Sequence, residues 1–243
     1  ATGMPNSVVV KPAAAGDQYR SISSKADRIT QVGSLGPSYI PFDSSPGGVA
    51  LQNMELQIAR DRLFDRRGLL TALDRLRKQA ETTGGLESVD EFRNQAFDVI
   101  LGSAADAFDL SKEDPRTLEM YDTASFDIPK SMQMKDISPI ALGKQMLLAR
   151  RLCEAGCGFI TVTSGGWDMH IGLENRLPYL GGAVDRAVSA FVRDVEQRGL
   201  SDEILLIVTG EFGRTPRINK IDRKGGVEGK GVDLRGRPNP KNK

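Results

Sequence analysis

CGFITVT at residues 157–163 and EILLIVT at residues 203–209 are two apolar runs of strand length. A helical pattern lies between them, from about Leu177 to Arg198, with apolar residues at helical spacing. A strand, a helix and a second strand in this order predict a parallel βαβ unit over residues 157–209, with a right-handed crossover. This unit decides the fold class, which is α/β.

Polar residues follow both runs and are candidates for a binding site. Ligands of open α/β sheets bind beyond the carboxyl ends of the strands, so we expect the two loops to be neighbours. Asp168 and His170 lie in the first loop and Glu211 lies in the second. Such a set suits zinc, manganese or another divalent ion, and the planar guanidinium of Arg214 suits sulfate, phosphate or carboxylate. The same residues also have a purely structural interpretation, as a capped turn and a surface ion pair between Glu211 and Arg214.

The sequence upstream of this unit is predicted to be helical over two stretches. Residues 54–135 carry helical patterns, including an apolar stripe at Leu69, Leu70, Leu73 and Leu76. Ser138 followed by Pro139 is typical of a helix start, and Gly156 and Gly199 are suited to ending helices. In the loop-rich residues 1–50, SVVV at residues 7–10 is the one predicted strand, and we expect this region to be an extended surface segment.

Composition excludes several classes of protein. The chain has 243 residues with a net charge of +1, which argues against a protein built mainly to hold nucleic acid, and no apolar run approaches a membrane span. Cys153 and Cys157 are interpreted as small core residues, with a disulfide or metal pair as the alternative. Residues 222–243 carry seven Lys and Arg against three Asp and Glu, and are predicted to be a disordered basic tail.

Several segments together resemble one protein family. They are GPSYIPF (36–42), AFDLSKE (107–113), LLARRLCEAG (147–156), FITVT (159–163), WDMH (167–170) and GEFGRTPRIN (210–219). In this order they are similar to the bacterial domain of unknown function 1501 family, whose members are sulfatase-like and related to the alkaline phosphatase superfamily. The resemblance covers roughly residues 5–221.

The resemblance implies a three-layer α/β/α fold like that of alkaline phosphatase, with metal ligands at the carboxyl edge of a mainly parallel sheet. The family's Trp-Asp-x-His motif falls on Asp168 and His170, and its Glu-Phe-Gly-Arg-Thr-Pro motif falls on Glu211 and Arg214. The implied activity is hydrolysis of a small anionic sulfate or phosphate ester with a divalent metal, which would be zinc, calcium, magnesium or manganese. The family also implies an extracytoplasmic location.

The chain departs from the family pattern at both ends. Family members have a strand and a Gly-Gly-Pro-Ser-type loop before the equivalent of Ala1, and a Gly-Arg-Asp-His motif shortly after Asn219, and neither is present here. We therefore expect residues 1–221 to be one incomplete domain, the tail to be non-native, and these 243 residues to be inactive alone. A non-enzymatic binding or surface-assembly role on the same fold is the alternative function.

Overall fold

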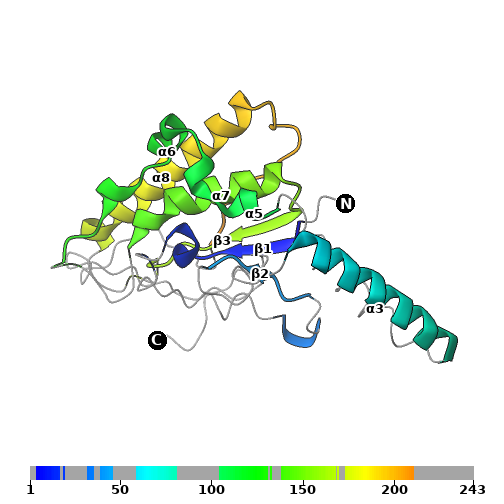
Figure 1. Ribbon diagram of the computed structural model, residues 1–243. Helices are drawn as coiled ribbons and strands as arrows, with labels where there is room; N and C mark the ends of the chain where they lie inside the picture. The colour runs from blue at the N-terminus through cyan, green and yellow to red at the C-terminus, as the bar shows by residue number, and fades with distance from the viewer. Residues whose placement is uncertain are drawn as a thin grey trace, which may run out of the picture.

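The computed structural model describes residues 4–16, 19, 32–35, 39–45, 59–80, 104–130, 132, 138–167, 169 and 173–210. They form a mixed α/β structure in which a small parallel sheet carries a layer of helices (Figure 1). None of the helices in these ranges is long and apolar enough to cross a membrane.

Three short strands form the sheet, in the order β2-β1-β3. They are β1 (Ser7–Val10), β2 (Phe42–Asp43) and β3 (Phe159–Val162), and both pairings are parallel. The three valines of β1 are fully buried, as expected for a central parallel strand that is covered on both faces. The predicted strands at 7–10 and within 157–163 are confirmed, but β1 lies in the middle of the sheet and not in a surface segment.

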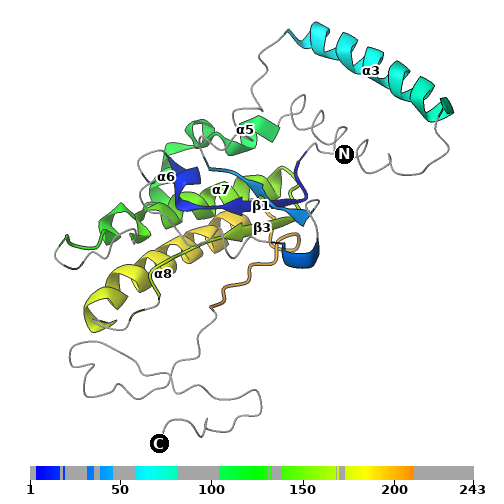
Figure 2. The same cartoon turned by 90° about the horizontal axis from the view of Figure 1, so that it is seen from below.

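Two long helices cover one side of the sheet. α7 (Leu142–Glu154) packs against the strands, and α8 (Leu173–Gln197) packs beside α7 (Figures 1 and 2). Leu148 and Leu152 of α7 form one buried cluster with Val8 of β1. The apolar face of each helix is therefore what holds it on the sheet, since burial of one such side chain contributes about 1.5–3 kcal/mol.

The predicted ends of these helices are confirmed. The Ser138 hydroxyl accepts a hydrogen bond from the Ile140 amide at 3.5 Å, at the start of the 3-10 turn that leads into α7. Gly156 follows α7 with φ of 94°, and Gly199 follows α8 with φ of 71°. Both glycines sit in the left-handed region, where a residue without a Cβ closes the last helical turn at the lowest cost.

The described residues before α7 form one long helix and two short ones, and the rest of the predicted helical stretch 54–135 lies partly outside the described residues. The three helices are α3 (Arg60–Ala80), α5 (Ala104–Phe108) and α6 (Pro115–Met120). Asp114 caps α6, because its carboxylate accepts a hydrogen bond from the Arg116 amide at 2.7 Å. The 3-10 turns are η1 (Pro12–Ala15), η3 (Gly33–Leu35), η5 (Leu110–Lys112), η6 (Ala124–Phe126) and η7 (Pro139–Ala141).

The prediction of a second strand at 203–209 was wrong. Residues 204–210 form no strand, so the βαβ unit over 157–209 is incomplete in the structure. Ile204 and Leu206 pack inward, whereas the side chains of Leu205 and Ile207 are 84% and 71% exposed. The apolar alternation is present, but within the described residues the segment forms no hydrogen-bonded ladder with β3 and nothing covers its outer side chains.

The three-layer arrangement is not confirmed either, because the described helices that pack on the sheet form a single layer.

The cysteines are free thiols. Cys157 belongs to the buried cluster under α7, which confirms its interpretation as a core residue, and Cys153 is partly buried. Burial, together with the neighbouring Cys157, raises the pKa of the Cys153 thiol to about 11, so that thiol is protonated at neutral pH.

A buried ion-pair network joins α7, α8 and the turn before α6. Arg150 lies at its centre, with its side chain 1% exposed. Its guanidinium donates hydrogen bonds to Asp194 at 2.7 Å, to Glu154 at 2.6 Å and to Glu113. Arg198 contacts the other oxygen of Asp194 at 2.7 Å. The network therefore ties together segments that are far apart in the sequence.

Candidate functional site

The carboxyl edge of the sheet is where open α/β folds bind their ligands. Because all three strands are parallel, they end at the same edge, and the polar residues just beyond them come together there. β1 leads into Lys11, β2 ends in Asp43 and β3 leads into Thr163. None of these three residues belongs to the ligand set predicted from the sequence.

Lys11 and Asp43 form an ion pair at this edge. The Lys11 Nζ lies 2.6 Å from the Asp43 Oδ2, and the other carboxylate oxygen accepts hydrogen bonds from the amide and hydroxyl of Ser45. Burial acts to raise the pKa of Asp43, but the hydrogen bonds from Lys11 and Ser45 outweigh it and hold the pKa below its ordinary value. The edge therefore carries an ionised carboxylate next to an ammonium group.

Gln145 of α7 holds the ends of two strands together. Its Nε2 donates to the Val10 carbonyl at 2.9 Å and to the Thr163 carbonyl at 3.0 Å. The hydroxyl of Thr163 is buried and finds no hydrogen-bond partner among the described residues. A buried hydroxyl without a partner costs free energy unless a ligand or water satisfies it, and this one lies at the entrance to the loop that carries Asp168 and His170.

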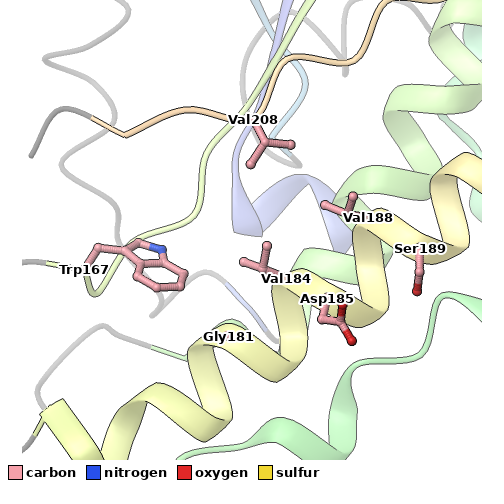
Figure 3. Close-up of a pocket in the computed structure, with 7 residues that line it drawn as sticks. All are labelled: Trp167, Gly181, Val184, Asp185, Val188, Ser189 and Val208. Carbon is pink, nitrogen blue, oxygen red and sulfur yellow. The ribbon is translucent and has the colours of Figure 1, made fainter. Parts of the chain in front are cut away.

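A cavity of about 420 Å³ lies between α8, the loop after β3 and residues 204–210. Figure 3 shows the ring of Trp167 and the side chains of Val184, Val188 and Val208 turned toward the shared space. The Asp185 carboxylate and the hydroxyl of Ser189 turn away from it. The cavity is therefore mainly apolar, and Trp167 is held beside it by a hydrogen bond of 3.3 Å from its indole nitrogen to the Ser164 hydroxyl.

The cavity brings together the segments that lead into the two predicted ligand loops. Trp167 immediately precedes Asp168, and Val208 lies three positions before Glu211. Asp168, His170, Glu211 and Arg214 themselves lie outside the described residues. Within the described part of the chain, no group of three or more His, Cys, Asp or Glu side chains is arranged to hold a metal ion.

The sequence signals for Asp43 and Gln145, which were not predicted as site residues, differ in strength. Asp43 directly follows an apolar residue and precedes two serines, which is a recognisable strand end, but the sequence does not show that it pairs with Lys11, 32 positions away. Gln145 lies on a helix face that is otherwise apolar. A polar residue on an apolar helix face is the one sequence signal that could have identified Gln145 as a functional or structural contact.

A comparison with known families gives one match. A family model described as "Protein of unknown function (DUF1501)" matches residues 2–229. The match covers most of the chain, and it continues past residue 221, where the resemblance in the sequence motifs was expected to end. No curated protein and no solved structure matches the chain.

Proposed function

The chain belongs to the DUF1501 family, and on that premise we propose that it carries metal ligands of a hydrolase that acts on sulfate or phosphate esters. Asp168, His170 and Glu211 are the proposed ligands, and Arg214 is the proposed binding residue for the anionic group. We also propose a sulfatase-like three-layer fold for the family domain and an extracytoplasmic location.

One observation carries this proposal: Trp167 and Val208 line the same cavity. Each residue lies one to three positions before a proposed ligand in the sequence, and a span of three residues reaches at most about 11 Å. Two loops anchored this close together can direct side chains from both toward one ion. The buried Thr163 hydroxyl, which has no hydrogen-bond partner in the described part of the chain, lies at the start of the first loop and supports a polar ligand there.

The chemistry of the donor set fits a divalent ion. Two carboxylates and one imidazole match the oxygen and nitrogen ligands of zinc and manganese, while calcium and magnesium favour oxygen donors. A bound divalent ion would supply charge stabilisation for the transferring sulfuryl or phosphoryl group. Arg214 would orient the ester through two parallel hydrogen bonds from its guanidinium. The apolar lining of the cavity beside the site would contact the organic part of a bound ester.

Turnover of aryl esters tests this function. The protein is assayed as it occurs naturally, with whatever residues flank the chain, using 4-nitrophenyl sulfate and 4-nitrophenyl phosphate. We expect metal-dependent turnover that Asp168→Ala lowers at least about 100-fold, because even residues that only support a metal ligand cost 10–100-fold when removed. Asp185→Ala is the matched control, since its exposed carboxylate turns away from the cavity and its loss is expected to leave turnover unchanged.

Absence of both bound metal and Asp168-dependent turnover would contradict the hydrolase proposal. That result would favour the non-enzymatic binding role, because a fold alone does not determine chemistry. Equal losses in Asp168→Ala and Asp185→Ala would also contradict it, since they would indicate a general effect on folding.

A further inference from the structure

The cavity beside the proposed site is apolar on the side that its described residues present to it. The indole ring of Trp167 and the side chains of Val184, Val188 and Val208 face the shared space (Figure 3). Its volume of about 420 Å³ lies within the range of small-molecule sites. Since an apolar cavity of about 150 Å³ already binds benzene, this space can hold a ring-sized group.

The described lining offers a bound molecule few hydrogen bonds. The side chains of Asp185 and Ser189 turn away from the space (Figure 3), and the Ser189 hydroxyl donates to the Arg186 carbonyl at 3.1 Å. The indole N–H of Trp167 already donates to the Ser164 hydroxyl at 3.3 Å. A sugar in this space would give up hydrogen bonds to water without replacing them from these side chains, whereas an apolar ring has none to lose.

The charge and shape of the lining favour a neutral aromatic ring. Among the described residues that line the cavity there is no Lys or Arg to pair with an ionised group, and the one carboxylate, on Asp185, turns away. The ring of Trp167 offers an aromatic surface, against which another ring packs in an offset or edge-to-face arrangement. The described lining therefore favours a neutral aromatic group over a sugar or an ionised group.

The cavity lies within covalent reach of the proposed ligands. Trp167 immediately precedes Asp168, and Val208 lies three positions before Glu211, a span of at most about 11 Å. A ring in the cavity can therefore belong to the same molecule as an ester group held at those ligands. This step rests on the proposed function, but binding of the ring alone does not.

We propose that this cavity binds the neutral aromatic ring of the alcohol from which the ester substrate is formed. The substrates of the site are then esters of ring-bearing apolar alcohols and not esters of sugars. Val188 and Val208 are the proposed specificity-determining residues, because their side chains line the space from two different segments, α8 and residues 204–210.

Phenol and myo-inositol test the preference, because both are six-carbon rings and differ in aromaticity and in the number of hydroxyls. Binding to the natural protein is measured by ligand-observed NMR with a metal chelator present. We expect phenol to bind saturably, with a dissociation constant at least about tenfold smaller than that of myo-inositol, since a small apolar difference in such a pocket is worth about tenfold or more.

Two pairs of variants locate the binding. Val188→Asp and Val208→Asp place a carboxylate in the lining, and each is expected to weaken phenol binding at least about tenfold, because the ring would desolvate the charge. Val192→Asp on α8 and Leu205→Asp in the segment 204–210 are the matched controls, since these side chains are 51% and 84% exposed and are not among the described lining residues. Phenol binding is expected to be unchanged in both.

Circular dichroism checks the fold of each variant. Val208 is 63% exposed, so Val208→Asp is expected to fold and keeps the test independent of any loss of structure in Val188→Asp. Absence of saturable phenol binding, equally tight binding of myo-inositol, or equal weakening in a control and its paired variant would overturn the proposal. Phenol and the chelated protein involve neither ester nor metal. Failure here is therefore distinct from failure of the hydrolase proposal, which depends on turnover and on Asp168.

Discussion

Arg150→Met is expected to lower the free energy of unfolding by about 3–5 kcal/mol, the range seen when one partner of a buried ion pair is removed. The side chains of Arg150, Asp194 and Glu113 are 1%, 4% and 7% exposed. Methionine fills similar space but donates no hydrogen bond, so two buried carboxylates lose their central cation. Tyr121 and Arg198 still contact Asp194, which keeps the expected loss within this range.

Chemical denaturation of the purified variant measures the loss. The control is Lys112→Met, which removes an ion pair of 2.5 Å between Lys112 and Asp106, in which both side chains are at least half exposed. Exposed pairs contribute little because water already solvates both charges, so a small change is expected. A similar small change in Arg150→Met would contradict the view that the buried network holds the helices together.

The role of Arg150 can also be tested by measuring the free energy of unfolding as a function of pH. Burial acts to raise the pKa of Glu113, but hydrogen bonds from Arg150 and Arg151 outweigh it and hold the pKa below its ordinary value of 4.5. A carboxyl with a lowered pKa stabilises the fold above its ordinary pKa and loses that contribution as the pH falls through the folded value. Arg150→Met is therefore expected to lose less of its remaining stability to acid than the unsubstituted chain.

Gly143→Ala is the second substitution with a large expected effect. An added Cβ would lie 1.6 Å from the carbonyl oxygen of Tyr121 and 2.8 Å from its carbonyl carbon. The obstacle is backbone and cannot rotate away, so α7 or the Tyr121 turn must move. We expect a loss of about 3 kcal/mol or more, at or above the upper end of the usual cost of overpacking.

Gly181→Ala in α8 is the matched control for this prediction. Its added Cβ would meet only Leu177, at an ordinary contact distance of 3.9 Å. Alanine is favoured over glycine in helices by about 1 kcal/mol, so the control is expected to keep or increase stability. Thermal unfolding measures the change in stability of both variants. Equal changes with the same sign would contradict the close approach of α7 to Tyr121.

Local signals explain what could be predicted from the sequence. The cap at Ser138 and the helix ends at Gly156 and Gly199 depend on residues within one turn, and all three were confirmed. The apolar face of α8 was predicted equally well from its helical spacing. Leu180, Ala187, Phe191 and Val195 are buried, and the partly buried Val184 packs against the same cluster as the last three.

Long-range pairing explains what could not be predicted. Asp194 is a buried carboxylate on α8, and its partner Arg150 is 44 positions away. No local pattern reveals such a contact. The run at 203–209 has the composition and alternation of a strand, yet strand formation also requires a neighbour that supplies hydrogen bonds and a layer that covers the outer side chains. Asp43 at the sheet edge was missed for the same reason, since its role depends on Lys11.

The most direct test of the proposed metal site uses the chain's single tryptophan. Trp167 immediately precedes Asp168 and lines the cavity together with Val208, which lies three positions before Glu211. Co²⁺ quenches nearby indole fluorescence, so a titration reports binding beside this residue. Asp168→Ala, His170→Ala and Glu211→Ala each remove one proposed ligand, and Asp185→Ala is the control.

We predict saturable quenching in the unsubstituted chain and in Asp185→Ala, and at least about tenfold weaker binding in each ligand variant. Glu211→Ala is the decisive variant, because Glu211 comes from the second loop and affects Co²⁺ beside Trp167 only if the two loops converge. Absence of saturable quenching, or binding that is unchanged in Glu211→Ala, would contradict a shared metal site.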